Sequence, residues 1–175
     1  LRRTMDRLGL TSPSQHIGYD ALNTDFDGAV KMAKTLCADT VIVPSMAEAH
    51  RNAEGWKAAV ANFSRLAERL KKTGLDFAYH NHDFEFVALP DGKTPHEMIF
   101  KGAPLLDWEM DIAWVIRGGA DPLKYIKKYA ANITSAHIKD IAPKGKNADE
   151  DFPGAEPDQG PIEKKQADGN KGDIE

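Results

Sequence analysis

Residues 39–82, DTVIVPSMAEAHRNAEGWKAAVANFSRLAERLKKTGLDFAYHNH, contain a strand, a helix and a second strand in succession. The run TVIV at 40–43 is continuous and β-branched, which is typical of a strand buried on both faces. A helix is predicted over about 54–73, because apolar side chains, Trp56 and Phe63 among them, recur at three- and four-residue spacing. A second strand over 75–82 then predicts a right-handed βαβ unit with two parallel strands.

The same alternation continues on both sides of this unit. Strands are predicted to begin near residues 11, 39, 75, 105 and 133, the fourth running over 105–112, with a helix between each neighbouring pair. Residues 1–8 read as the second half of a helix that Gly9 ends, so the chain is expected to begin within an element. The fold class is therefore α/β with about five parallel βα units. Five units make an open sheet, whereas eight close a barrel, and periodicity does not choose between them.

The last part of the chain has a different composition. Residues 142–175 contain four prolines, five glycines and fourteen charged side chains, and only three large apolar ones. Such a segment buries too little surface to offset its ordering entropy. We therefore predict a folded domain over residues 1–141 and a polar, disordered tail over 142–175.

Charge and composition exclude several classes of partner. The 175 residues carry a formal net charge of −4, which argues against a nucleic-acid partner because phosphate binding needs clustered Lys and Arg. No apolar run reaches the roughly 18 residues of a membrane span, so a soluble chain without a membrane partner is expected. The one cysteine, Cys37, is expected to be a buried structural thiol. The compartment stays open with the cytoplasm favoured, and the oligomeric state is unknown.

Polar side chains gather at the ends of three successive predicted strands. The sequences there are YHNHDFE at 79–85, DWEMD at 107–111 and HIKD at 137–140. Side chains alternate along a strand, so each end presents two polar groups on one face: His80 and His82, Glu109 and Asp111, and His137 and Lys139. Any one of them could simply cap a helix or bond a loop. Three ends in succession instead favour a catalytic site or a site for Mn, Zn, Co or Mg, which imidazole and carboxylate ligands suit.

Three further residues are weaker candidates. His16 ends the first predicted strand and could line the same mouth, although a surface histidine is an equal alternative. Trp114 and Arg117 follow Asp111 by a few residues. Aromatic faces stack on sugar rings and guanidinium groups bind oxyanions, while a core position is the alternative for the tryptophan.

Three motifs together resemble one known family. YHNHDFEF at 79–86, WEMDIAWV at 108–115 with RGGADP at 117–122, and AHIKD at 136–140 are similar to motifs of the sugar phosphate isomerase/epimerase family, the xylose isomerase-like branch of TIM barrels. The resemblance covers about residues 1–141. It implies a partial TIM (β/α)8 barrel in which this chain supplies strands three to seven, whereas the first two strands and the eighth have no counterpart here.

The resemblance also implies a metal centre. In the family a Glu, an Asp, a His and a second Glu come from the last four strands, and Asp111 and His137 match the Asp and the His. The place of the first Glu holds His80 and its neighbours with Glu85 just beyond, so Glu85 is taken as the third ligand. The fourth has no counterpart. Further roles follow for other strand-end residues: His80, His82 and Lys139 in catalysis, and His16, Glu109, Trp114 and Arg117 in substrate binding.

The implied function is a divalent-metal-dependent sugar (phosphate) isomerase or epimerase of carbohydrate metabolism. It would act on a small keto sugar through an enediolate, and without the fourth ligand this chain alone is not expected to be active. A lyase or hydrolase of 3-keto sugars on the same barrel is an alternative. An endonuclease of abasic DNA is disfavoured by the acidic charge balance, and a non-catalytic fragment or binding module is the alternative from another class.

Overall fold

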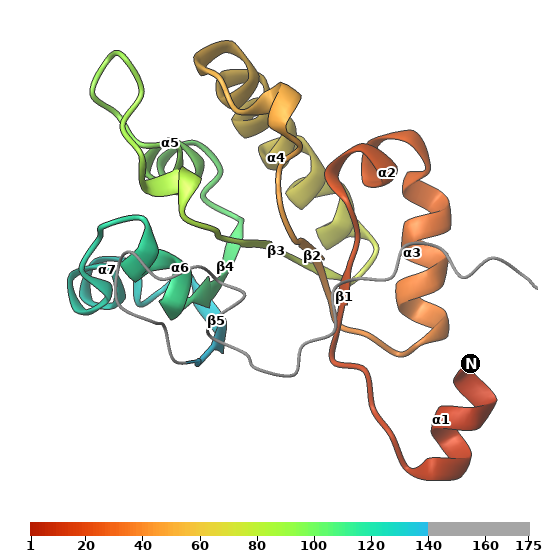
Figure 1. The fold of residues 1–175 in the computed structure, drawn as a ribbon. Helices are drawn as coiled ribbons and strands as arrows, with labels where there is room; N and C mark the ends of the chain where they lie inside the picture. Colours follow the sequence, from red (N-terminus) through yellow and green to blue (C-terminus); the bar gives the residue numbers. More distant parts are fainter. Residues whose placement is uncertain (140–175) are drawn as a thin grey trace, which may run out of the picture. The chain divides into compact units, whose positions relative to one another are not determined.

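The chain forms one curved parallel sheet with helices around it (Figure 1). The structure, a computed structural model, describes residues 1–139, and the predicted tail over 142–175 lies outside these residues. The spatial order of the strands equals their order in the chain. The strands are β1 (Ser14–His16), β2 (Thr40–Val43), β3 (Asp76–His80), β4 (Asp107–Asp111) and β5 (Ile133–His137). All five predicted strands are present, and every neighbouring pair is parallel.

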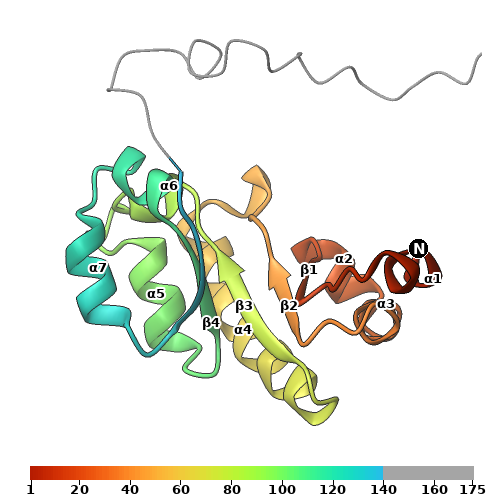
Figure 2. The ribbon, with the colours of Figure 1, turned by 90° about the horizontal axis from the view of Figure 1, so that it is seen from below.

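Helices lie on the outside of the curved sheet, as Figure 2 shows for α3 (Phe26–Thr35), α4 (Ala53–Lys72), α5 (Pro95–Gly102) and α7 (Pro122–Tyr129). Together with the five parallel strands they make a partial TIM barrel, so the predicted fold class is confirmed. The α-helices are α1 (Arg2–Leu8), α2 (Tyr19–Thr24), α3 (Phe26–Thr35), α4 (Ala53–Lys72), α5 (Pro95–Gly102), α6 (Ile112–Arg117) and α7 (Pro122–Tyr129). Two 3₁₀ turns complete the described elements, η1 (Glu48–His50) and η2 (Phe84–Phe86).

The longest helix, α4, packs on the sheet as its sequence predicts. The Asn52 side chain caps it by accepting a hydrogen bond from the Gly55 N–H. Its apolar side buries Trp56 and Phe63, with 1% and 0% of their surface exposed, so both are confirmed as core residues. Phe63 lies edge-on against Phe77 of β3, which joins the helix to the middle of the sheet.

Two short helices were not predicted. Helix α2 has six residues and no side-chain cap, so its sequence carries little signal. Helix α6 begins where a strand over 105–112 was expected to continue. The strand ends one residue earlier because the Asp111 carboxylate caps α6, with Oδ1 accepting from the Trp114 N–H at 3.1 Å.

The prediction for Cys37 is wrong. The buried side of α3 carries Ala29 and Ala33, but Cys37 follows the helix end, and its side chain is exposed. Its φ of 57° places it in the left-handed region that commonly ends a helix. Among the described helices, none is both long enough and apolar enough to cross a lipid bilayer.

The register of the sheet determines which polar residues at the strand ends lie next to each other on neighbouring strands. His80 lies opposite Glu109, and Asp111 lies opposite His137. A bulge between Trp108 and Glu109 shifts the pairing of β4 with β5 before the polar end is reached. The carboxyl ends of three strands therefore present imidazole and carboxylate groups at neighbouring levels.

Candidate functional site

Three side-chain atoms, one from each of the strands β3, β4 and β5, lie close together at the carboxyl end of the sheet. His80 Nε2 lies 3.2 Å from His137 Nδ1 and 3.4 Å from Asp111 Oδ2. His137 Nδ1 lies 3.5 Å from the same oxygen. A tetrahedral ion with bonds of about 2.1 Å to its ligands holds them about 3.4 Å apart. The three atoms, here called the outer group, therefore have the spacing of three ligands around one divalent ion.

The protein holds His80 with one ring nitrogen turned toward this group. Its Nδ1 lies 3.0 Å from the Pro44 carbonyl oxygen, which can only accept, so the proton belongs on Nδ1. The lone pair of Nε2 then points toward the other two atoms of the outer group. Burial lowers the pKa of His80, which keeps the ring neutral, as a metal ligand must be.

Asp111 supplies a buried anionic oxygen to the group. Its side chain has no exposed surface, and within residues 1–139 no donor makes a well-aligned hydrogen bond to Oδ2. The Lys139 ammonium forms an ion pair with this oxygen at 2.8 Å. Burial would raise the pKa of Asp111, but contacts from Lys139 and the Trp114 N–H outweigh it, so the pKa is lowered. The ionised carboxylate suits a cation, and in this structure the Lys139 ammonium is the cation paired with its Oδ2.

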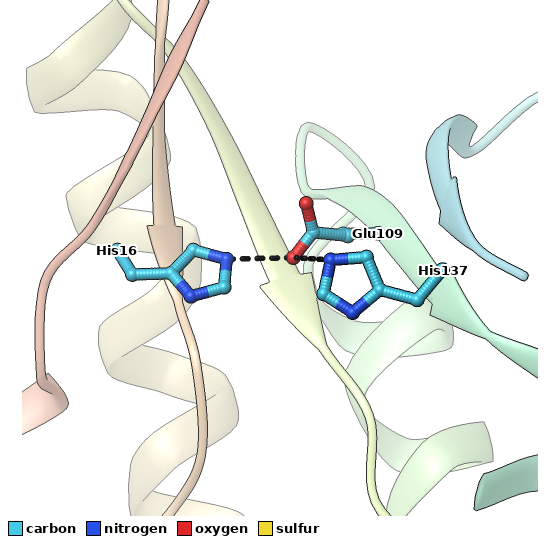
Figure 3. Close-up of side chains that lie close together, drawn as sticks. All are labelled: His16, Glu109 and His137. Carbon is cyan, nitrogen blue, oxygen red and sulfur yellow. Dashed lines mark hydrogen bonds and ion pairs between the residues drawn. The ribbon is translucent and has the colours of Figure 1, made fainter. Parts of the chain in front are cut away.

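A second set of side chains, here called the inner group, shares His137 with the outer one (Figure 3). Glu109 lies between two rings, with Oε2 2.7 Å from His16 Nε2 and 3.6 Å from His137 Nε2. Its Oε1 accepts from Ser135 Oγ at 3.4 Å. Burial would raise the pKa of Glu109, but the hydrogen bond and the electrostatic contribution of His16 outweigh it, and the pKa is lowered. Glu109 is only 5% exposed, so little of it faces the open mouth.

Glu85 lies outside both groups, contrary to its predicted place among the ligands. Its Oε1 accepts from the Tyr79 hydroxyl at 2.5 Å, and its Oε2 accepts from the His82 N–H at 2.7 Å. Tyr79 and His80 are consecutive in β3, so their side chains point to opposite faces, and Glu85 joins the face of Tyr79. Burial raises the pKa of Glu85 to about 7. Among the described residues, the third atom of the outer group comes from His80 and not from Glu85.

Asn81 was missed by sequence reasoning, although it joins two of the three strands that carry the outer group, β3 and β4. Its Oδ1 accepts from Trp108 Nε1 at 2.8 Å and from the Asp111 N–H at 2.9 Å. Its Nδ2 donates to the Asp111 carbonyl at 3.1 Å, and the side chain is fully buried. The sequence did contain a signal for this role of Asn81. It is a polar residue on the face opposite His80 and His82, and that face of the strand is otherwise apolar.

Several residues that were predicted to bind substrate or act in catalysis lie around two aromatic rings, those of Phe84 and Trp114. The His82 ring stacks on Phe84, with centroids 5.6 Å apart and planes at 8°, and lies 5.1 Å from the ring of Trp114. Burial and the neighbouring His80 lower the pKa of His82 to about 4. The cationic groups of Arg117 and Lys139 lie 5.7 and 5.8 Å from the Trp114 ring. The structure thus places His82 and Lys139 beside the outer group, and Arg117 beside Trp114, and the roles of these residues stay predictions.

Comparison with known proteins supports the fold. No protein-family model matches the sequence. An inosose dehydratase from Clostridium perfringens is 27% identical over 93 residues, which are 53% of this chain and 31% of that protein. A sugar phosphate isomerase/epimerase structure from Parabacteroides distasonis superposes with a TM-score of 0.68 at 24% identity, over 79% of this chain and 57% of that one. A xylose isomerase domain protein from Planctomyces limnophilus gives 0.58 at 18%, over 81% and 59%.

These proteins are longer than the part that this chain matches. The matched stretch spans about a third of the inosose dehydratase and less than two thirds of each solved structure. The five strands therefore correspond to part of the barrel in each structure, in agreement with the partial barrel predicted from the motifs.

Proposed function

We propose that this chain, which has the fold of the xylose isomerase-like TIM barrels, is the metal-binding part of a divalent-metal-dependent enzyme that acts on keto sugars. The observation that carries the proposal is the near-equilateral arrangement of His80 Nε2, Asp111 Oδ2 and His137 Nδ1, with sides of 3.2, 3.4 and 3.5 Å. Two imidazole nitrogens and one carboxylate oxygen are a ligand set for Zn, Mn, Co or Mg.

Three ligands leave positions open on the ion for the substrate. When bound, a divalent cation acts as a Lewis acid that polarises a carbonyl and makes the neighbouring C–H bond more acidic. The chain's own residues would hold the sugar next to it. Lys139 is 45% exposed and its ammonium can donate to a substrate oxygen, while the neutral ring of His82 can exchange hydrogen bonds with a hydroxyl.

Trp114 offers an apolar surface to the same mouth. It is half-buried and lies beside His82 and within reach of two cationic side chains. The C–H faces of sugar rings pack on aromatic rings, and the cations favour an electron-rich or anionic substituent. A small sugar or sugar phosphate is the proposed substrate class.

Isomerase or epimerase chemistry and dehydratase chemistry both begin by removing a proton next to a carbonyl. Isomerisation returns that proton to another carbon or another face, whereas dehydration expels a hydroxyl group. The structural similarity to a sugar phosphate isomerase/epimerase supports the first reaction. The sequence similarity to an inosose dehydratase supports a lyase as the second candidate.

A cobalt-loaded sample tests the site and the substrate class together. Co²⁺ has a visible spectrum that reports its ligands, and we expect one Co²⁺ per chain with imidazole and carboxylate ligation. A keto sugar should change this spectrum more than the alditol that lacks the carbonyl. Asp111→Asn, which keeps the shape of the side chain, should remove both effects. The matched control is Asp91→Asn, whose carboxylate pairs with Lys93 on the surface.

A folded chain that takes up no Co²⁺, or takes it up equally after Asp111→Asn, would overturn the proposed centre. The product separates the two reactions once a substrate is found. An isomerase or epimerase product has the mass of the substrate, and a dehydratase product is lighter by one water.

A further inference from the structure

Arg51 carries a positive charge that has no ion-pair partner in the described part of the chain. It follows η1 in the loop that leaves the carboxyl end of β2, and its side chain is exposed. Its Nε donates a hydrogen bond to the Met46 carbonyl oxygen at 2.9 Å. Within residues 1–139 the guanidinium makes no other hydrogen bond. The N–H groups of Nη1 and Nη2 therefore remain available to another acceptor.

The guanidinium of Arg51 is held in a fixed orientation. Its carbon atom Cζ lies 3.7 Å from the centre of the Phe84 ring, which is a cation–π contact. The hydrogen bond to Met46 fixes the edge of the group that carries Nε. The remaining edge is a fork of N–H groups, which suits the paired oxygen atoms of a phosphate or a carboxylate. A side chain that is already ordered loses little entropy when a ligand binds.

Two sets of contacts place Arg51 at the same end of the sheet as the outer group. The loop that carries it begins at Pro44, whose carbonyl oxygen lies 3.0 Å from His80 Nδ1. On the other side, the His82 ring lies 5.0 Å from the ring of His80 and 5.6 Å from the ring of Phe84. After burial and His80, the charge of Arg51 also contributes to the lowered pKa of His82, so its electric field reaches the site.

We propose that Arg51 binds an oxyanion group of the substrate, a phosphate or a carboxylate, at the end of the sugar away from the carbonyl. This inference rests on the proposed keto-sugar function and narrows its substrates to anionic sugars. A sugar with its carbonyl at the outer group would reach Arg51 beside the rings of His82 and Phe84, whose faces suit its C–H groups. Lys139 is less suited to hold a full anion, because its ammonium already pairs with Asp111.

NMR of the full chain without metal tests the oxyanion site separately from the proposed metal centre. The probes are inorganic phosphate, fructose 6-phosphate and fructose, added at constant pH and ionic strength. Nitrogen-15 spectra follow the Nε–H signals of the arginines, and phosphorus-31 spectra measure the affinity of the two phosphates. Arg51→Met removes the charge and identifies the Arg51 signal by its absence.

Arg69→Met is the matched control. The Cζ atom of Arg69 also lies 3.7 Å from the centre of a ring, that of Phe26. Arg69 belongs to α4, however, which lies on the outside of the sheet (Figure 2). Circular dichroism establishes that each variant is folded.

Phosphate and fructose 6-phosphate should shift the Arg51 signal until it saturates, and fructose should leave it unchanged. Arg51→Met should weaken the binding of fructose 6-phosphate by about tenfold, because hydrogen bonds to a charged group contribute at least this much to affinity. Arg51→Lys keeps the charge but not the fork, so it should retain part of the affinity. Arg69→Met should bind as the unchanged chain does.

Unchanged affinity in Arg51→Met would overturn the inference. Equal shifts of the Arg51 and Arg69 signals with phosphate would also overturn it, because they would show that no particular arginine binds the ion. The cobalt titration separates this failure from that of the proposed function. If Co²⁺ binds at the outer group while Arg51 does not respond to phosphate, only this inference fails. If Arg51 binds phosphate and the chain takes up no Co²⁺, the oxyanion site stands and the proposed metal centre fails.

Discussion

His80 Nε2 and His137 Nδ1 face each other at 3.2 Å although they belong to strands that are not adjacent. The strand between them, β4, contributes Asp111, whose Oδ2 lies within 3.5 Å of both nitrogens. Parallel strands of a curved sheet bring their carboxyl ends together in this way, so three short strands suffice to assemble the atoms. The spacing of these three atoms is the observation on which the proposed metal centre rests.

The buried histidine His96 should make the fold sensitive to acid. It is 1% exposed among aromatic rings, and within residues 1–139 neither ring nitrogen has a hydrogen bond. Burial lowers its folded pKa from 6.5 to about 3, so the unfolded chain binds the proton first. Its contribution to stability is full above pH 6.5 and is lost toward pH 3, by about 1.4 kcal/mol per pH unit.

Urea unfolding between pH 4 and pH 7 measures this effect. His96→Leu should reduce the loss of stability on acidification, because no proton can then bind at this place in the unfolded chain. His50→Leu is the control, since His50 lies at the surface beside Asp20. An equal dependence on pH in the His96 variant and the unchanged protein would contradict the prediction.

Glu85 should produce the opposite dependence on pH. Burial raises its folded pKa from 4.5 to about 7, so in this range the folded state holds a proton that the unfolded state releases. The contribution is full below pH 4.5 and is lost as pH rises through 7, by about 3 kcal/mol in all. Glu85→Gln should remove this decline in unfolding experiments from pH 4.5 to pH 8. A decline of the same size in the variant would show that another group causes it.

Replacing Cys37, which follows the end of α3, by glycine should stabilise the protein. The φ of 57° at Cys37 strains a residue that has a side chain, and glycine adopts this region without strain. Cys37→Gly should raise the free energy of unfolding by about 0.5–1 kcal/mol. The matched control is Gly74→Ala, which places a side chain at a φ of 79° after α4 and should destabilise. Thermal unfolding of the two variants, measured side by side, decides whether both signs are right.

Asn81 should be essential to the fold of the site. Replacing it by alanine leaves the Trp108 indole N–H and the Asp111 N–H buried without their acceptor. Each unmet buried donor costs about 1–3 kcal/mol, so Asn81→Ala should lose at least 2 kcal/mol in urea unfolding. Asn62→Ala, which removes hydrogen bonds near the surface, should lose much less. Similar losses in the two variants would contradict this role.

The sequence predicted the sheet because its signals are local. The β-branched run at 40–43 and the capped, apolar-spaced helix that follows it depend only on nearby residues. Asp111 was expected within a longer strand, since nothing before it in the sequence reveals that its carboxylate caps a six-residue helix. Cys37 was misplaced because helical spacing does not show at which residue the helix ends.

The site was predicted in part for a similar reason. Alternation along each strand placed His80, Asp111 and His137 on the inner face, which the structure agrees with. Glu85 lies five residues beyond His80, and a 3₁₀ turn brings it back to the opposite face, against Tyr79. The pairing of Glu109 with His16 joins residues 93 positions apart, and only the curvature of the sheet brings them together.

Calorimetric titration with Mn²⁺ or Zn²⁺ tests the central claim most directly. The account predicts one ion per chain, with binding abolished in His80→Ala, Asp111→Ala and His137→Ala and unchanged in Cys37→Ala, whose thiol lies at the surface away from the site. Equal affinity in all of these proteins, each shown to be folded, would contradict the proposed metal centre.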